Sequence, residues 1–319
     1  MSLINEIGGY LEFETYSGNE FHQDAIALNC GRNCLAYLIE AHNITSLHLP
    51  RYLCSSVFST CQKYGVQIQY YQINEDFTPR IDFEVKSNEW FYLVNYYGQL
   101  SQEYIADVVR KIPNLIVDNA QAFFQSPING IDTFYTCRKY FGVSDGAYLY
   151  TDSILNRELE IDISFHRMNH ILARFEIAAS EYYSEYVDNN KSFADEPIKY
   201  MSKLTHNLLR GIDYQVIKKR REENFRYLHE HLKDKNKLQL RVPEGPFAYP
   251  LLIENGAEMR KALQQQKIYI PTLWPNVLEM AQKGSLEYEY AANILPLPCD
   301  QRYGRDDMEM LIKRSINRL

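Results

Sequence analysis

The chain has 319 residues, enough for one large and one smaller domain. Its net charge of −7, with no basic cluster, argues against nucleic acid as a partner. No apolar run is long enough to span a bilayer, and the first residues lack the basic and apolar regions of a secretory signal. We therefore expect a cytoplasmic protein that does not enter a membrane.

Helix-like and strand-like segments alternate from residue 29 to residue 152. Asn29 is a plausible N-cap of the first helix. The run "WFYLVNYYG" (90–98) is nearly all apolar, which is typical of a strand buried on both faces. Such alternation favours an α/β fold with a mostly parallel sheet covered by helices. We expect helices at 29–42, 55–65 and 102–112, and strands at 46–52, 66–73, 90–98, 114–121, 132–139 and 146–152.

The pattern becomes helical from Ile154 to about Leu232, with a long charged stretch at 203–232 that is suited to bridge two domains. The remaining residues predict a smaller α/β unit. We therefore divide the chain into a large domain, 1–215, which includes the helical region 154–209, and a small domain, 216–319. In the small domain we expect strands at 248–253 and 268–275 and helices at 257–267 and 305–319.

Metal binding is not expected. The six cysteines form no C-x-x-C pair, and their spacing suits neither a zinc site nor a disulfide scaffold. His166 and His170 stand one helical turn apart, but the glutamate of an HExxH site is missing. The pattern instead favours a structural or subunit-contact role for the two histidines.

Three polar clusters stand where α/β sheets usually bind ligands. "NCGRN" (29–33) begins a helix, whose N–H groups and dipole suit a phosphate, although any capped helix looks similar. Asp118 ends an apolar strand, where an acid is equally well a helix cap or a charge aimed into a cleft. Lys139 lies among aromatic residues, where the plain alternative is a surface lysine that snorkels to water.

The ordered set of these motifs resembles one family, the DegT/DnrJ/EryC1/StrS group of fold-type-I aminotransferases that use pyridoxal 5′-phosphate (PLP). "LNCGRNCLAYL" is similar to its "SGxxAL" helix start, and "LPRYLCSSV" to its "P-x-Y/T" turn. "VNYYGQ" resembles "HxxG", "IVDNAQAF" resembles "EDxAQA", and "TCRKYFGVSDGAYL" resembles "SxRKxxxxxDGG". The likeness covers roughly residues 7–152 and weakens beyond.

The resemblance implies a role for each motif. Lys139 would form the Schiff base with PLP, its amine activated by an apolar pocket. Asp118 would pair with the pyridinium nitrogen, and Gln121 would donate to the phenolic oxygen of the ring. Backbone groups of Gly31 and Arg32, the Arg32 side chain and the Thr136 hydroxyl would hold the phosphate.

The same resemblance implies the reaction. An amino donor such as glutamate would load the cofactor, which would then aminate a keto sugar carried on a nucleotide. The product would serve cell-surface polysaccharide or deoxy-aminosugar biosynthesis. We also expect a homodimer with the cofactor near the interface, because the likeness places the helices of 154–209 next to a partner.

Some positions depart from the family pattern. Leu53 and Cys54 stand where an aromatic residue usually stacks on the cofactor, and Tyr52 is the candidate to compensate. Asn95 replaces the usual histidine, and "YMSKLTHN" (200–207) stands in place of the "N-x-R-M" loop. Two alternatives therefore stay open: a PLP-fold binding or regulatory protein without turnover, and a PLP enzyme with a non-sugar substrate.

The acceptor pocket is expected to be aromatic and polar. Tyr52, Tyr96, Tyr97 and Trp274 offer rings and polar hydrogens suited to a sugar or nucleotide face. An amino-acid carboxylate would instead need a bidentate arginine, for which Arg302 and Arg305 are the candidates.

Overall fold

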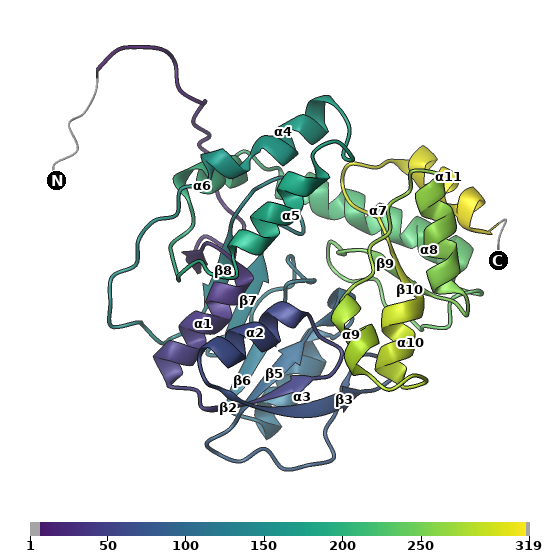
Figure 1. Ribbon diagram of the computed structural model, residues 1–319, viewed down its shortest axis with the longest axis horizontal. Helices are drawn as coiled ribbons and strands as arrows, with labels where there is room; N and C mark the ends of the chain where they lie inside the picture. The colour runs from purple at the N-terminus through teal and green to yellow at the C-terminus, as the bar shows by residue number, and fades with distance from the viewer. Residues whose placement is uncertain (1–6, 317–319) are drawn as a thin grey trace.

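A computed structural model of the chain describes residues 7–316. An eight-stranded sheet is its largest unit, with the spatial order β1-β8-β7-β6-β5-β2-β3-β4 (Figure 1). The strands span Ile26–Leu28 (β1), Ser46–Pro50 (β2), Gln67–Ile73 (β3), Pro79–Arg80 (β4), Trp90–Val94 (β5), Leu115–Asp118 (β6), Asp132–Thr136 (β7) and Ala147–Tyr150 (β8).

The middle of the sheet is parallel, from β3 through β2, β5 and β6 to β7. Its two edges are antiparallel, where β4 pairs with β3, and β8 pairs with β7 and β1. Every residue of β6 is buried, as are four of the five in β5, because a parallel sheet is covered on both faces. The predicted α/β fold with a mostly parallel, mixed sheet is confirmed. The short strand β1 was not predicted.

Three helices lie between strands of this sheet: α1 (Gly31–His42) between β1 and β2, α2 (Ser55–Lys63) between β2 and β3, and α3 (Gln102–Lys111) between β5 and β6. The predicted N-cap of the first helix is wrong by one residue, because Cys30 occupies that position and makes no side-chain cap bond. Asn29 instead accepts a hydrogen bond from Asn33 and donates to the Pro197 carbonyl. It therefore ties the start of α1 to the segment before α6.

The region after β8 is less helical than predicted. Three short helices, α4 (Asn169–Glu176), α5 (Tyr183–Ser192) and α6 (Lys203–Arg210), lie above the sheet in Figure 1 and are separated by irregular chain. The long helix expected at 203–232 is interrupted after Arg210. Asp213 caps the next helix, α7 (Tyr214–Leu232), by accepting a hydrogen bond from the Val216 N–H, so the chain restarts there.

The C-terminal unit is built on a two-stranded antiparallel sheet, β9 (Tyr249–Leu252) with β10 (Ile294–Leu297). The strand predicted at 268–275 is wrong, since that segment is irregular and holds Pro271 and Pro275, which lack a donor for a ladder. The predicted strand at 248–253 and the helices at 257–267 and 305–319 are found, except that 317–319 lies outside the described residues. The helices are α8 (Gly256–Gln265), α9 (Pro275–Met280), α10 (Leu286–Asn293) and α11 (Arg305–Ile316).

Helix α7 connects the two parts of the molecule. Its first residue, Tyr214, packs in an aromatic core together with Tyr140 and Phe141. Phe225, Leu228 and Leu232 from the same helix pack in the core of the C-terminal unit. The division between residues 215 and 216 stays a prediction. Within residues 7–316, no helix is long and apolar enough to cross a membrane.

Candidate functional site

The candidate site begins at the carboxyl ends of β6 and β7, two neighbouring parallel strands. Asp118 is the last residue of β6, where it pairs with Phe134 of β7, and Thr136 ends β7. Because parallel strands end at the same edge of the sheet, the motifs of Asp118 and Thr136 share one region. Helix α1 begins in the same region, with Gly31 lying against the ring of Phe134.

Asp118 is a buried carboxylate that forms no ion pair within the described residues. One oxygen accepts from the Ala120 N–H at 2.8 Å and the other from the Tyr92 hydroxyl at 2.8 Å. Burial raises the pKa of Asp118, and the charge of Lys139 is the largest influence that opposes the rise. The two side chains therefore share an electrostatic environment, and the carboxylate is suited to receive a cationic N–H.

Gln121 is buried and fixed in one orientation. Its Oε1 accepts from the Tyr97 N–H at 2.7 Å. A backbone N–H can only donate, so this contact identifies the oxygen of the amide and leaves the NH₂ group available as a donor. That is the group the predicted role of Gln121 requires, although the role itself stays a prediction.

Lys139 lies in the turn that follows β7, and its side chain is exposed. The expectation that it is held in an apolar pocket is wrong for the single chain. Its neighbours Tyr140 and Phe141 are buried, whereas the Lys139 amine lies 5.7 Å from the ring centroid of Phe247. Phe247 comes from the segment before β9, about a hundred residues away, and nothing in the sequence singled it out.

The start of α1 carries an uncompensated positive charge. Within the described residues, no acidic side chain pairs with Arg32 or Arg138. Arg32 donates to the Asn190 carbonyl at 3.3 Å, and Arg138 donates to the side-chain oxygen of Asn190. Burial lowers the pKa of Arg138, and Arg32 and Arg167 add to that effect. Two arginines beside a helix start, close to half-buried Thr136, suit an anion such as a phosphate.

The sequence did not identify Arg138 or Asn190 as candidate phosphate-binding residues. Arg138 is adjacent to Lys139 in the quoted motif, so its type and position were a usable signal. Asn190 lies on α5, in a region where the resemblance has faded, and only the fold brings it to the start of α1.

The aromatic residues expected to line an acceptor pocket are instead packed together. Tyr52, Tyr96, Tyr97 and Trp274 are all buried, and the ring centroids of Tyr52 and Trp274 are 4.6 Å apart in an edge-on contact. Tyr52 is fully buried, so no face of its ring is free to stack on a cofactor, and its proposed compensating role does not fit. Phe77 and Tyr290 complete this group, which we call the interdomain aromatic cluster.

The arginine candidates for a carboxylate are also engaged. Arg302 directs Nε and Nη2 at the two oxygens of Asp300, at 2.7 and 2.8 Å. Arg305 lies over the ring of Tyr227, 5.2 Å from its centroid. The Arg302 fork is therefore not free in this conformation, whereas Arg305 only stacks on a ring.

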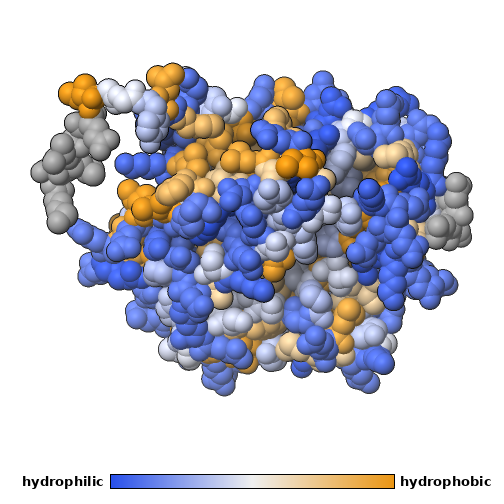
Figure 2. Space-filling model, turned by 45° about the horizontal axis from the view of Figure 1, so that its top comes forward, coloured by the Kyte–Doolittle hydropathy of each residue, from blue (hydrophilic) through white to orange (hydrophobic). Residues whose placement is uncertain are grey.

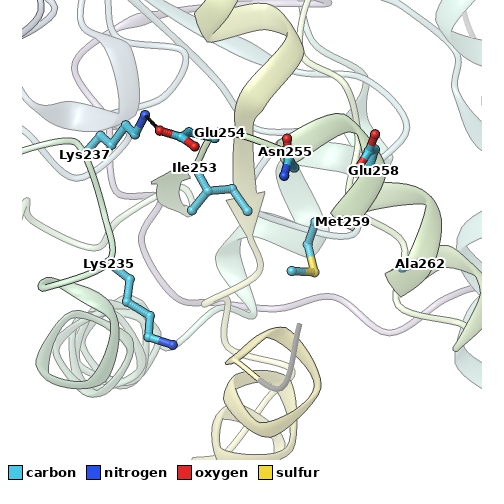
Figure 3. A pocket seen from close by; sticks show the side chains of 8 residues that line it. All are labelled: Lys235, Lys237, Ile253, Glu254, Asn255, Glu258, Met259 and Ala262. Carbon is cyan, nitrogen blue, oxygen red and sulfur yellow. Dashed lines mark hydrogen bonds and ion pairs between the residues drawn. The ribbon is translucent and has the colours of Figure 1, made fainter. Parts of the chain in front are cut away.

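A surface cavity of about 670 Å³ lies elsewhere, on the C-terminal unit (Figure 3). Ile253 and Met259 point into it, and Lys237 and Glu254 form an ion pair of 2.9 Å at one side. None of the predicted site residues lines this cavity. It is therefore separate from the strand-end site.

Sequence comparison finds no matching family model and no matching curated protein. Many solved structures are nevertheless similar. One is a DegT DnrJ EryC1 StrS aminotransferase from Brucella abortus, with 14% identity over 92% of this chain and 85% of that chain and a TM-score of 0.62. Another is Helicobacter pylori PseC, an aminotransferase involved in pseudoaminic acid biosynthesis, with 11% identity, 92% and 86% coverage and a TM-score of 0.63.

A third similar structure has a different activity. It is an Escherichia coli GDP-4-keto-6-deoxy-D-mannose-3-dehydratase with bound hydrated PLP, with 14% identity, 91% and 87% coverage and a TM-score of 0.60. At this level of identity, the similarity shows that the chain has the fold of these PLP proteins. The residues at the strand ends must carry the argument for function.

Proposed function

We propose that the chain is a PLP-dependent aminotransferase whose acceptor is a keto sugar carried on a nucleotide, in cell-surface polysaccharide or deoxy-aminosugar biosynthesis. The observation that carries the proposal is the arrangement around Asp118. A buried carboxylate without a cation, a fixed amide donor and an exposed lysine lie beside a positively charged helix start. These are the partners that a pyridine N–H, a phenolic oxygen, an aldehyde and a phosphate need.

The cofactor, when bound, supplies an electron sink for the carbon that loses a proton. Asp118 would hold the ring N–H and so keep the ring cationic, since an ionised carboxylate favours the protonated nitrogen. Gln121 would orient the ring by donating from Nε2. The Lys139 amine would carry the covalent bond at rest and, once released, would move the proton at the substrate carbon.

The phosphate end would be held by this chain's own groups. Gly31 and Arg32 offer their backbone N–H groups at the start of α1, and Thr136 offers its hydroxyl. Arg32 and Arg138 would exchange their bonds with Asn190 for charge-assisted bonds to the phosphate.

A keto sugar is favoured as the acceptor by two observations. Two proteins of this fold are an aminotransferase of pseudoaminic acid biosynthesis and a dehydratase of a nucleotide-linked keto sugar. In addition, the fork of Arg302, one of the two candidate carboxylate arginines, is occupied by Asp300. The amino donor is proposed to be an amino acid such as glutamate.

The chief competing function is a PLP-fold binding protein without turnover. The interdomain aromatic cluster favours it, because rings expected to face an acceptor are buried against one another. Asp118, Gln121 and Lys139 oppose it, since a protein that only binds has no need for a proton-transferring lysine.

A homodimer is also proposed. Apolar side chains gather on the face formed by α4, α5 and the chain before them, at the top of the molecule in Figure 2. No residue of α4 is buried in the single chain. Exposed apolar patches of this kind mark association surfaces. The exposed residues there include Ile163, Phe165, Leu172, Phe175, Ile177 and Tyr183.

The protein is further proposed to work in the cytoplasm, because all six cysteines are free thiols, which fits a reducing compartment.

The test of function measures the visible absorption of the bound cofactor. Protein loaded with PLP should show a visible absorption band that disappears on addition of glutamate and returns with a nucleotide-linked keto sugar. Lys139→Ala should lack the covalent band. A wild-type band that persists with every amino donor would support the binding protein, and an unchanged band in Lys139→Ala would remove Lys139 from the site.

A further inference from the structure

Arg221 on α7 is the largest fully buried side chain among the described residues, with 1% of its surface exposed. It has no carboxylate partner among the described residues. Nε donates to the Gln301 side chain at 2.8 Å, Nη1 to the Pro246 carbonyl at 2.9 Å and Nη2 to the Tyr140 carbonyl at 3.1 Å. A buried charge with only neutral partners is costly, so its position calls for an explanation.

The three partners of Arg221 belong to separate parts of the chain. Tyr140 directly follows Lys139 in the turn after β7. Pro246 directly precedes Phe247, whose ring faces the Lys139 amine at 5.7 Å. Gln301 belongs to the loop before α11, and its Nε2 donates to the same Tyr140 carbonyl at 2.7 Å. One guanidinium therefore joins the turn of Lys139, the loop of Phe247 and the C-terminal unit.

The turn itself is compact. The N–H groups of Tyr140 and Phe141 both donate to the Cys137 carbonyl at 2.9 Å, so movement of the Tyr140 carbonyl would move Lys139 with it. The guanidinium carbon of Arg221 also lies over the Tyr140 ring, 4.5 Å from its centroid. Arg221 thus restrains both the backbone and the ring of the residue next to Lys139.

We propose that Arg221, with Gln301, is a positioning residue that fixes the Lys139 amine opposite Phe247 and so sets its readiness to bond covalently with the cofactor. Arginine fits this task because its planar fork donates from three separate nitrogens to three oxygens, whereas the donors of lysine all leave from one nitrogen. The inference rests on the proposed role of Lys139, but its effect on the turn exists without a cofactor.

The first measurement uses cofactor-free protein. Arg221→Lys keeps the charge and loses the fork, while Gln301→Ala removes the second donor to the Tyr140 carbonyl. Hydrogen exchange of the Tyr140 and Phe141 amides should become about tenfold faster in both variants, as expected when a hydrogen bond of ordinary strength is lost. Gln301 is only half-buried, so Gln301→Ala remains usable if Arg221→Lys does not fold.

Asn224→Ala is the matched control. Asn224 is buried on the same helix, and its amide donates to the carbonyls of Cys299, Asp300 and Tyr303, all outside the Lys139 turn. Its loss should lower the melting temperature but leave exchange in the turn unchanged. Equal acceleration in Asn224→Ala would show only general loosening, and unchanged exchange in both test variants would overturn the proposal.

The second measurement separates this inference from the proposed function. Protein is mixed with saturating PLP and samples are reduced with borohydride at successive times, so that the fraction of Lys139 that carries the cofactor is followed against total bound PLP. The test variants should form the bond about tenfold more slowly than wild type and Asn224→Ala. If wild type forms no bond at Lys139, the proposed function fails. If wild type and the test variants form it equally fast, the role of Arg221 fails.

Discussion

The two sides of the candidate site are built in different ways. On one side, Asp118, Gln121 and the arginines at the start of α1 are polar groups whose bonds leave charge or donors available. On the other, the interdomain aromatic cluster is packed without free ring faces, as the complete burial of Tyr52 and Tyr97 shows. We call the first the prepared side, because its polar groups can still bind a partner, and the second the packed side, because its rings already contact one another.

This difference teaches that burial has opposite meanings for the two kinds of residue. A buried carboxylate without a cation is costly and needs a reason, which a bound cation supplies. A buried tyrosine or tryptophan among other rings lowers the free energy of the fold and needs no ligand. Variants on the two sides should therefore affect different quantities, chemistry on one and stability on the other.

Trp274→Ala should have the largest effect, and the effect should be on stability. The side chain is buried and contacts Tyr52 and Tyr96, and removal of a large buried ring typically costs about 3–5 kcal/mol. Chemical denaturation should show this loss, while the absorption of bound PLP stays unchanged. Trp274→Phe, which keeps a ring, is the control. A raised KM for the acceptor with unchanged stability would instead support the predicted place of Trp274 in the acceptor pocket.

Asp118→Asn should have the next largest effect, on chemistry. The amide is the same size but cannot hold a ring cation, so the half-reaction with glutamate should slow by about 100-fold or more, as for loss of a preorganised polar partner. Asp132→Asn is the matched control, because Asp132 is equally buried at the opposite end of β7 and lies 2.7 Å from His42. Normal turnover in Asp118→Asn would reduce Asp118 to a structural acceptor for Ala120 and Tyr92.

Asn190→Asp tests the phosphate end. The new carboxylate would pair with Arg32 and Arg138 and repel a phosphate, so affinity for PLP should fall by about tenfold to a hundredfold, or about 1.5–3 kcal/mol. Titration of each protein with PLP, followed by absorbance at two salt concentrations, measures this affinity. Asn190→Ala, which adds no charge, should bind PLP at least as well as wild type. Equal affinities of the two variants would mean that the arginines do not meet the phosphate.

The sequence predicted the prepared side better than the packed side. The order of strands and helices between residues 46 and 152 and the strand-end position of Asp118 follow from local apolar patterns, and these were confirmed in the fold. The exposure of Lys139 and the burial of Tyr52 depend on residues such as Phe247 and Trp274, which lie far away in the chain. Such contacts arise from packing between units, and one sequence does not encode them as a local pattern. The short strands β1 and β10 were missed for a similar reason, because pairing rather than period defines them.

Tyr92→Phe should have the most specific effect, a dependence of stability on pH. The Tyr92 hydroxyl donates to Asp118 and so favours the ionised carboxylate, against the burial that raises its pKa. Without this bond, the pKa of Asp118 should rise further. The folded chain then holds a proton that the unfolded chain releases, so the free energy of unfolding falls as pH rises from the ordinary carboxyl range through the raised pKa.

In cofactor-free protein, Tyr92→Phe should therefore lower the free energy of unfolding more at neutral pH than in acid. The difference should be up to the 1.5–3 kcal/mol typical of a hydrogen bond to a charged group. Tyr71→Phe is the matched control, because the equally buried Tyr71 hydroxyl donates to the Tyr92 carbonyl at 2.7 Å and does not touch Asp118. Its cost should be the same at both pH values, since neither partner titrates there. Denaturation of both variants at acid and neutral pH makes the comparison. If the losses of unfolding free energy in the two variants vary with pH in the same way, the bond to Asp118 is only one more buried hydroxyl contact. The Tyr92 hydroxyl then does not favour the ionised form of Asp118.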